Sequence, residues 1–443
     1  MDINNTLTID GAIKEFAPQI EKTSPLGWSW ITFLSVLVLF GFYGLYTQIA
    51  EGHIVTGMRD NVVWGIYIVN FIFFMGVSYA GALISGTLHL FRSEWRKPVI
   101  RMAEWITIIS LLIGPLYILL CIGRLDKLHN IALFGRIQSP ITWDVIAIST
   151  DIVGCIIFLY MALLRDFAHL RDYPELKVPK WKKKLYYYFA LKYHDTPEQR
   201  KKLNRTVDIM AAMVIAIAII VYSVLAWIFS VTLQPGWHST IFGPYFVIAA
   251  VYSGTAVLIV SMYLFRKVYK LEHVITELHF KNMGIILLVL GAFFGYFTFS
   301  EYLTKWYGSQ KNDELLISIL FDKYYWEFVI SNYIGVLLPL IIIGIPKFRT
   351  IKSITFTSLV VILALWLNRY LIVVPTLESP YLPIQDSRSA WVDYGGTWVE
   401  WSLTLGGIAG FLLLFTLASK LVPIVQLSAL VKKDKSEENR KSE

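Results

Sequence analysis

Two aspartates with a helical spacing stand in a long apolar stretch of this sequence. Asp144 and Asp151 lie in the segment "SPITWDVIAISTD", which begins at Ser139. In an α-helix a spacing of seven residues places both side chains on one face, about 10 Å apart along the axis. Carboxylates inside a bilayer are energetically unfavourable and commonly mark proton or ion pathways. The pair therefore predicts a ladder of carboxylates that carries protons along this helix.

Neighbouring polar residues either extend this ladder or have a structural role. Asp144 is expected in the first turn of its helix, where a negative charge also complements the helix dipole. Thr150 would extend the ladder. Glu104 either continues the proton path or forms an interfacial ion pair with Arg101. Three further charged residues fall at predicted helix ends, where we expect them to be solvated: Arg165, Asp166 and Asp208.

A second polar group is predicted where one apolar segment ends and the next begins. Arg124 closes the stretch "CIGR" (121–124), and Trp143 precedes Asp144 at the start of the following segment. An arginine that donates to a carbonyl oxygen, beside an acid that gives or takes a proton, suits a quinone, which is an amphipathic ring with two carbonyls. Asn70 either bonds a neighbouring helix or helps to position this ring.

The elements that must position these residues are membrane-spanning helices. The chain has 443 residues, of which 56% are hydrophobic and only 16% are charged, whereas soluble domains carry about 25% charged residues. Ten apolar segments are long enough to cross a hydrocarbon core of about 30 Å. The predicted fold is therefore an all-α integral membrane protein with ten spans: 28–48, 61–91, 98–122, 142–164, 207–231, 244–265, 282–304, 324–345, 353–374 and 398–422.

The distribution of basic residues predicts the orientation of these spans. Of the 40 Lys and Arg residues, 31 fall on the side that carries both termini and 9 on the other side. The positive-inside rule then predicts a cytoplasmic N-terminal segment (1–27), a membrane domain (28–422) and a charged cytoplasmic tail (423–443). The basic, aromatic run at 177–188 is expected to contact anionic lipid headgroups, and we favour this over nucleic acid.

Two functional alternatives to a quinone site follow from the same residues. The chain contains two cysteines, Cys121 and Cys155, without a CxxC or CxxCH motif, so no iron–sulfur cluster or c-type haem is expected. A haem b cytochrome would need two facing histidines, and only His89 and His279 are candidates. An ion-coupled secondary transporter would fit the buried acids and the resemblance of the small-residue segments 78–86 and 251–261. Against it, no pair of spans carries Gly or Pro interruptions near the midplane.

Several stretches together resemble the NrfD/PsrC family of polytopic, quinone-interacting membrane subunits. They include "WGIYIVNFIFFMGVSYAG" (64–81), "GR…SPITWDVIAIST" (123–124 and 139–150) and "GWHSTIFGPYFVIAAVYSGTA" (236–256). The C-terminal "NRYLIVVPTLESPYLP" and "TWVEWSLTLGGIAGF" resemble the ten-helix DsrP, HybB and ActC types. The resemblance covers about residues 60–420.

The resemblance implies two four-helix bundles, about 61–231 and 244–374, with the first and last spans beside them. It implies no haem, iron–sulfur cluster or metal in this chain, with menaquinone as the exchangeable substrate. It also implies an iron–sulfur, ferredoxin-like partner and further redox subunits on the outer face of a prokaryotic cytoplasmic membrane. The chain would then be the quinone-reactive subunit of a respiratory oxidoreductase, with possible proton translocation.

By position, the resemblance assigns the quinone site to Asp144, Arg124, Ser139 and Trp143. The sequence departs from the family pattern at Cys121, where relatives carry His or Asp. It departs again at Asp151, where an aromatic residue is expected, and at Asn368, where relatives often carry Glu beside the arginine. If relatives use that His or Asp as a quinone ligand, Cys121 of the site cannot serve in the same way. Asp151 then either compensates for the missing polar group or reroutes the proton.

Overall fold

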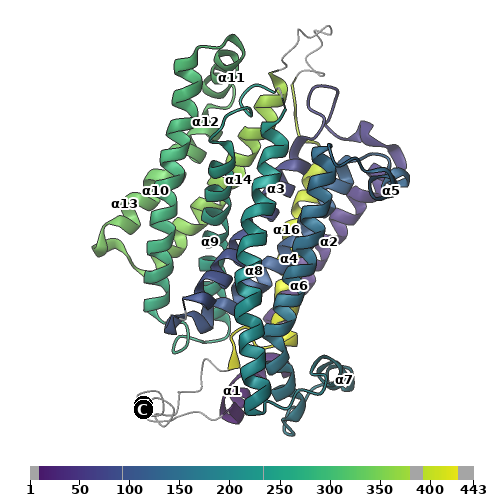
Figure 1. Ribbon diagram of the computed structural model, residues 1–443, viewed down its shortest axis with the longest axis vertical. Coiled ribbons are helices and arrows are strands. Elements are labelled where there is room, and N and C mark those ends of the chain that lie inside the picture. Colours follow the sequence, from purple (N-terminus) through teal and green to yellow (C-terminus); the bar gives the residue numbers. More distant parts are fainter. Residues whose placement is uncertain (1–8, 92, 233, 380–392, 428–443) are drawn as a thin grey trace.

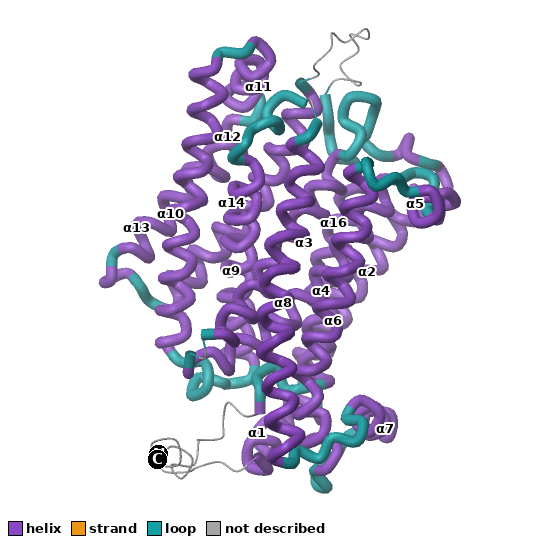
Figure 2. Tube along the Cα trace, in the orientation of Figure 1, coloured by secondary structure: helices purple, strands orange, loops and turns teal. Residues whose placement is uncertain are grey.

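The computed structural model describes residues 9–91, 93–232, 234–379 and 393–427, and no strand occurs among them (Figure 2). Ten of the described helices are long and apolar enough to cross a membrane (Figure 1). This confirms the predicted all-α, ten-span fold. The helices run between two ends of the molecule, which we name the α5 end and the α7 end after two short helices there, α5 (His129–Phe134) and α7 (Lys180–Phe189).

The long helices follow the predicted order of spans. They are α2 (Pro25–Glu51), α3 (Gly65–Leu90), α4 (Lys97–Cys121), α6 (Pro140–Asp172), α8 (Pro197–Ser230), α9 (Phe242–Val268), α10 (Glu277–Gly308), α14 (Ile351–Glu378) and α16 (Trp398–Leu421). The eighth span consists of α12 (Tyr325–Phe328), the π-helical turn η4 (Val329–Ile334) and α13 (Gly335–Gly344). Two further helices lie at the ends, α1 (Ile9–Glu21) and α11 (Lys311–Asp322).

Short polar residues define where several of these helices begin. Ser24 caps α2 by accepting a hydrogen bond from the Gly27 amide at 3.1 Å. Thr196 caps α8 in the same way, and a proline follows each of these two caps. Thr397 and Glu400 form a reciprocal capping box at the start of α16. Such caps satisfy backbone N–H groups that have no partner within the helix.

Some helices are longer or less regular than the spans that the sequence predicted. α6 continues to Asp172 and α8 begins at Pro197, so both helices extend beyond the predicted spans toward the α7 end. At 34 residues, α8 measures about 51 Å, longer than the hydrocarbon core. The eighth span is interrupted by the π-helical turn, with Pro339 inside α13, where the sequence predicted one continuous helix.

The helices pack around α3 and α9. α3 contacts α4, α8, α9 and α14, while α9 contacts α8, α10 and α14 as well. Most of the apolar part of α3 is buried, whereas α2 is largely exposed and packs mainly on α16. α3, α4, α6 and α8 thus form one neighbourhood and α9, α10, α13 and α14 another. The exact boundaries predicted for two bundles stay a prediction.

The two small-residue segments noted in the sequence meet at the contact between α3 and α9. A Cβ atom added to Gly254 would lie 2.1 Å from the Cβ of Ala80, far closer than two carbon atoms can approach. Small residues let helix backbones approach closely in a membrane, where van der Waals packing drives association. Whether these segments derive from a duplication stays open, but their composition is explained by this contact.

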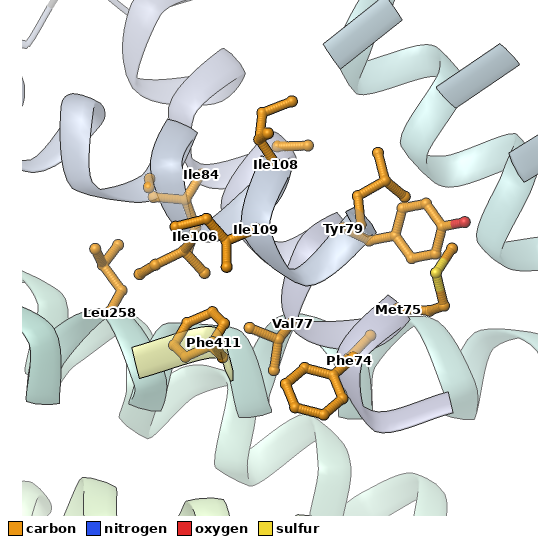
Figure 3. Close-up of a cluster of buried hydrophobic side chains, with 14 of the residues drawn as sticks. Phe74, Met75, Val77, Tyr79, Ile84, Ile106, Ile108, Ile109, Leu258 and Phe411 are labelled. Carbon is orange, nitrogen blue, oxygen red and sulfur yellow. The ribbon is translucent and has the colours of Figure 1, made fainter. Parts of the chain in front are cut away.

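Apolar side chains from four helices fill the centre of the molecule. In Figure 3, Phe74 and Val77 of α3 lie near Ile106 and Ile109 of α4, with Phe411 of α16 alongside. The polar groups described below are embedded in this tightly packed surrounding. Their positions are therefore restricted by packing as well as by hydrogen bonds.

Candidate functional site

The two aspartates of α6 lie on its buried face. Asp144, Ile148, Asp151 and Cys155 are buried, while the residues between them are wholly or partly exposed. This is the stripe expected from helical spacing. Because α6 begins at Pro140, no acidic residue lies in its first turn, so the expected first-turn position of Asp144 was wrong. Asp144 lies one turn further along the helix, where the helix dipole stabilises a negative charge less.

Within the described residues neither aspartate forms an ion pair with a basic residue, and each has a free carboxylate oxygen. The Oδ1 atom of Asp144 has no hydrogen-bond partner, and the residue is 8% exposed. Asp151 is fully buried; its Oδ1 accepts a hydrogen bond from the Cys155 thiol at 3.3 Å, and its Oδ2 has none. Both carboxylates lie close enough to Tyr79 of α3 to interact electrostatically with its hydroxyl. They therefore face α3 across the interior.

Below Asp151 a small cavity continues toward the α7 end. It has a volume of about 10 Å³, which is roughly the space of one water molecule. Cys155 lines one wall, Ser85 and Thr107 line others, and Glu104 of α4 lies at its border. The cavity therefore connects the partner of Asp151 with the next carboxylate of the interior.

Glu104 belongs to a buried cluster of three charges. Arg101 donates a hydrogen bond of 2.7 Å to Asp166 of α6 and lies 3.5 Å from Glu104. Arg101 is 1%, Glu104 2% and Asp166 4% exposed. The expectation that Asp166 is solvated was wrong, because Arg101 reaches it across the contact between α4 and α6. Neither oxygen of Glu104 has a hydrogen-bond partner, so its carboxylate faces the cavity without one.

A larger polar cavity, which we name the vestibule, adjoins this cluster at the α7 end. Its volume is about 330 Å³. Charged and polar side chains of α3, α4, α6 and α8 contribute to its lining, which includes His89, Arg96, Arg101, Arg165, Asp166, Asn204 and Asp208. From Asp144 to the vestibule, polar residues thus follow one another through the interior. We name Asp144, Asp151, Cys155, Glu104, Arg101 and Asp166 the polar file.

The other predicted site residues have different surroundings. Both ends of the Asn70 amide are occupied: its nitrogen donates to Thr404 at 2.8 Å and its oxygen accepts from Trp366 at 2.9 Å. Arg124 is largely exposed and pairs with Asp126 at 2.8 Å. Asn70 therefore ties three helices together, whereas Arg124 is held at the surface.

Three of the remaining predicted residues donate hydrogen bonds to backbone carbonyls, and the fourth, Ser139, does not cap its helix. Trp143 donates to the Ile137 carbonyl, and the exposed Thr150 hydroxyl donates to the Ile146 carbonyl of its own helix. The Cys121 thiol donates to the Trp64 carbonyl at 3.8 Å. Ser139 precedes α6 without a side-chain cap. The structure thus brings together Asp144, Asp151 and Glu104, and leaves Thr150 outside the polar file.

Sequence reasoning missed Tyr79 and the roles of Cys155 and Arg101. Cys155 lies four residues after Asp151, on the same face of α6, so its spacing was a usable signal. Tyr79 had no such signal, because α3 is apolar and buried on almost all sides. Arg101 was placed in an interfacial pair, and only the packing of α6 against α4 reveals its second partner.

Comparisons with known proteins agree with this architecture. A sequence profile described as "Polysulphide reductase, NrfD" matches residues 54–379. A selenate reductase subunit from Mesobacillus selenatarsenatis is 22% identical over 410 residues, which cover 89% of this chain and 94% of the relative. The Hdr-like menaquinol oxidoreductase integral membrane subunit of Archaeoglobus fulgidus is 22% identical over 92% of this chain and 96% of the relative.

A further relative is named for a reaction with a quinone. The menaquinone reductase integral membrane subunit of Nitratidesulfovibrio vulgaris is 23% identical over 449 aligned residues. These cover 96% of this chain and 98% of the relative. The similarity therefore extends over nearly the whole of both chains.

Proposed function

Because the chain belongs to the NrfD polysulphide reductase family, we propose that it is the quinone-reactive membrane subunit of a respiratory oxidoreductase complex. The observation that carries the proposal is Asp144, a nearly buried carboxylate with a free oxygen near the α5 end of α6. Two relatives are named for menaquinone or menaquinol, which supports menaquinone as the substrate.

In this proposal Asp144 exchanges a proton with the quinone. Reduction of a quinone to a quinol takes two electrons, which a partner subunit supplies, and two protons, which in this proposal pass one after the other through Asp144. Asp144 gives a proton to a ring oxygen and is then reprotonated from Asp151, and oxidation of a quinol runs the same steps in reverse. A positioned carboxylic acid suits general acid–base catalysis of this kind.

The bilayer gives a quinone direct access to this part of α6. Residues on either side of Asp144 present apolar side chains outward, with Ile141 62% and Ile146 58% exposed. Trp143, Ser139 and Cys121 lie at the same end and are proposed to border the ring. Because the amide of Asn70 is already bonded at both ends, we propose that Asn70 acts by holding α3 in place.

We propose that the partner with iron–sulfur clusters docks at the α5 end. The basic α7 end is assigned to the cytoplasm by the positive-inside rule, which places both termini there and the α5 end outside. The connection before α6 exposes several large apolar side chains at that end: Leu125, Leu133, Phe134 and Ile137. Such a surface favours either a protein partner or the membrane interface.

The polar file supplies protons from the cytoplasm in this proposal. A proton enters the vestibule, reaches Glu104 beside Arg101, and crosses the small cavity toward Cys155 and Asp151. The free oxygens of Glu104 and Asp151 are the acceptors that such a transfer needs. Electrons that arrive from outside and protons that arrive from inside would couple the reaction to the membrane potential.

The test of the proposal is the substitution Asp144→Asn in the assembled complex. Loss of a positioned acid lowers the rate by about 100-fold or more, so we expect quinone turnover to fall by that factor. Asp322→Asn, an exposed aspartate at the end of α11, serves as the matched control and should leave turnover unchanged. Normal turnover in an assembled Asp144→Asn complex would contradict the role.

A further inference from the structure

Arg369 of α14 is a buried cation without a counter-charge. It is 2% exposed, and its Nη1 and Nη2 atoms have no hydrogen-bond partner. Within the part of the chain that the structure describes, no carboxylate forms an ion pair with it. Arg101 is buried to a similar extent, but its guanidinium forms an ion pair with the Asp166 carboxylate at 2.7 Å. Arg369 thus differs from Arg101 in having no anionic partner.

This isolation is energetically unfavourable. A guanidinium keeps its positive charge in proteins, so it cannot become neutral in response to burial. The Arg369 Cζ atom lies 4.6 Å from the centre of the Phe246 ring, and this cation–π contact compensates the charge only in part. Water supplies hydrogen bonds but no opposite charge. A buried charge without a partner destabilises a protein strongly, so a negatively charged group beside Arg369 would stabilise the fold.

The surroundings of Arg369 offer a second unused polar group. The hydroxyl of Tyr222 on α8 is buried without a partner, and it lies close enough to Arg369 for electrostatic interaction. Both groups border the same ring, since the Arg369 guanidinium lies 4.6 Å from the centre of the Phe246 ring and the ring of Tyr222 packs against that ring as well. Aromatic rings pack around these groups. The centre of the Phe246 ring lies 4.6 Å from that of Phe242 and 6.0 Å from that of Tyr222. These hydrogen-bond donors have no carboxylate opposite them among the described residues, and the rings around them leave little space. The surroundings therefore favour a small anion that accepts hydrogen bonds.

We propose that Arg369 and Tyr222 form a binding site for a small monovalent anion of the chloride class, between α8, α9 and α14. The anion neutralises Arg369 and accepts hydrogen bonds from the guanidinium and the Tyr222 hydroxyl. This inference does not depend on the proposed reaction with quinone, because it rests on residues outside the polar file.

The site nevertheless lies next to the polar file. The ring of Tyr222 contacts that of Tyr79, with centroids 4.8 Å apart, and Tyr79 faces Asp144 and Asp151. In Figure 3 the hydroxyl of Tyr79 points away from the apolar side chains of α4. Two tyrosine rings therefore separate the anion from the acids. With the anion bound, Arg369 becomes part of a neutral pair.

Bromide is a suitable probe, because it replaces chloride and scatters X-rays anomalously. The purified full-length chain would be crystallised in bromide, and an anomalous difference map would be calculated. We expect a peak within hydrogen-bond distance of the Arg369 guanidinium and the Tyr222 hydroxyl. We also expect a saturable rise of the unfolding temperature with chloride but not with gluconate, which is too large for the site. Ordered water alone at Arg369, or equal stability in both salts, would overturn the proposal.

Two variants separate the site from general salt effects. Asn368→Asp introduces a carboxylate one residue before Arg369 with almost no change of shape. The Tyr245 hydroxyl, which now accepts from Asn368 at 2.7 Å and lies close enough to Arg369 for electrostatic interaction, can donate to it. This built-in charge should abolish both the bromide peak and the chloride effect in a folded protein. Asn332→Asp, at a partly buried asparagine that also has a free oxygen, should retain both. A bromide peak that persists at Arg369 in Asn368→Asp would contradict the inference.

Discussion

Arg101 of α4 and Asp166 of α6 form an ion pair of 2.7 Å in which both side chains are nearly excluded from solvent. Arg101 also donates to the Ala162 carbonyl at 3.0 Å, so it bonds α6 at two levels. Glu104 shares the same guanidinium. This cluster both holds two helices together and closes the polar file at the vestibule.

Loss of Arg101 should destabilise the protein strongly. Arg101→Met removes one partner of a buried pair and leaves two acids without compensation, which costs about 3–5 kcal/mol. The free energy of unfolding, measured by denaturant in mixed micelles, would report this. Arg124→Met is the control, since the pair of Arg124 with Asp126 is exposed and its loss should have no measurable effect. Equal free energies of unfolding for Arg101→Met and Arg124→Met would show that the buried cluster does not stabilise the contact between α4 and α6.

Glu104 should be needed for proton entry. Glu104→Gln keeps the shape of the side chain but cannot carry a proton, so proton uptake from the α7 side should slow by at least about tenfold. A pH-sensitive dye on that side of proteoliposomes containing the complex would measure uptake during turnover. Glu277→Gln, an exposed residue paired with Lys281 at the same end, should behave like the wild type. Unchanged uptake in Glu104→Gln would mean that protons bypass the polar file.

The contact between α3 and α9 should tolerate no larger residue at Gly254. Gly254→Ala adds a Cβ that would lie 2.1 Å from that of Ala80, so the helices must separate. Overpacking of this kind costs about 1–3 kcal/mol. Gly308→Ala is the control, because nothing lies within 4 Å of its added Cβ. Thermal unfolding of both variants would test the contact, and equal melting temperatures would argue against it.

Asp195, between α7 and α8, should make stability dependent on pH in the acid range. Burial raises its pKa, but hydrogen bonds from Arg200 at 2.8 Å and Tyr193 at 3.0 Å, with the charge of Arg165, hold the pKa below its ordinary value. The stabilisation is therefore complete above the unfolded pKa of about 3.9. It is lost as the pH falls through the lower, folded pKa.

Asp195→Asn tests this assignment. Thermal unfolding between neutral and acid pH should show a smaller loss of stability on acidification in Asp195→Asn than in the wild type, because the variant already lacks the ionised group. At neutral pH the variant should be the less stable of the two. Asp10→Asn, at an exposed aspartate of α1, should retain the wild-type dependence. Identical acid curves for Asp195→Asn and the wild type would contradict the assignment.

The sequence by itself determined the features that depend on the order of residues within one helix. The lengths of the apolar runs predicted ten spans, since a run of about 20 residues is what a bilayer requires. The helical repeat placed Asp144 and Asp151 on one face of α6, and the structure has that face buried. Both features depend only on local sequence, so no knowledge of the neighbouring helices was needed.

Only the tertiary structure decided which groups from different helices meet. It placed Asp166 against Arg101, bonded both ends of the Asn70 amide, directed Arg124 to the surface, and left Arg369 among aromatic rings. The π-helical turn in the eighth span was decided in the same way. Contacts between helices depend on the register and rotation of whole elements. Because many alternative packings bury equivalent apolar surface, a local pattern of residues does not specify them.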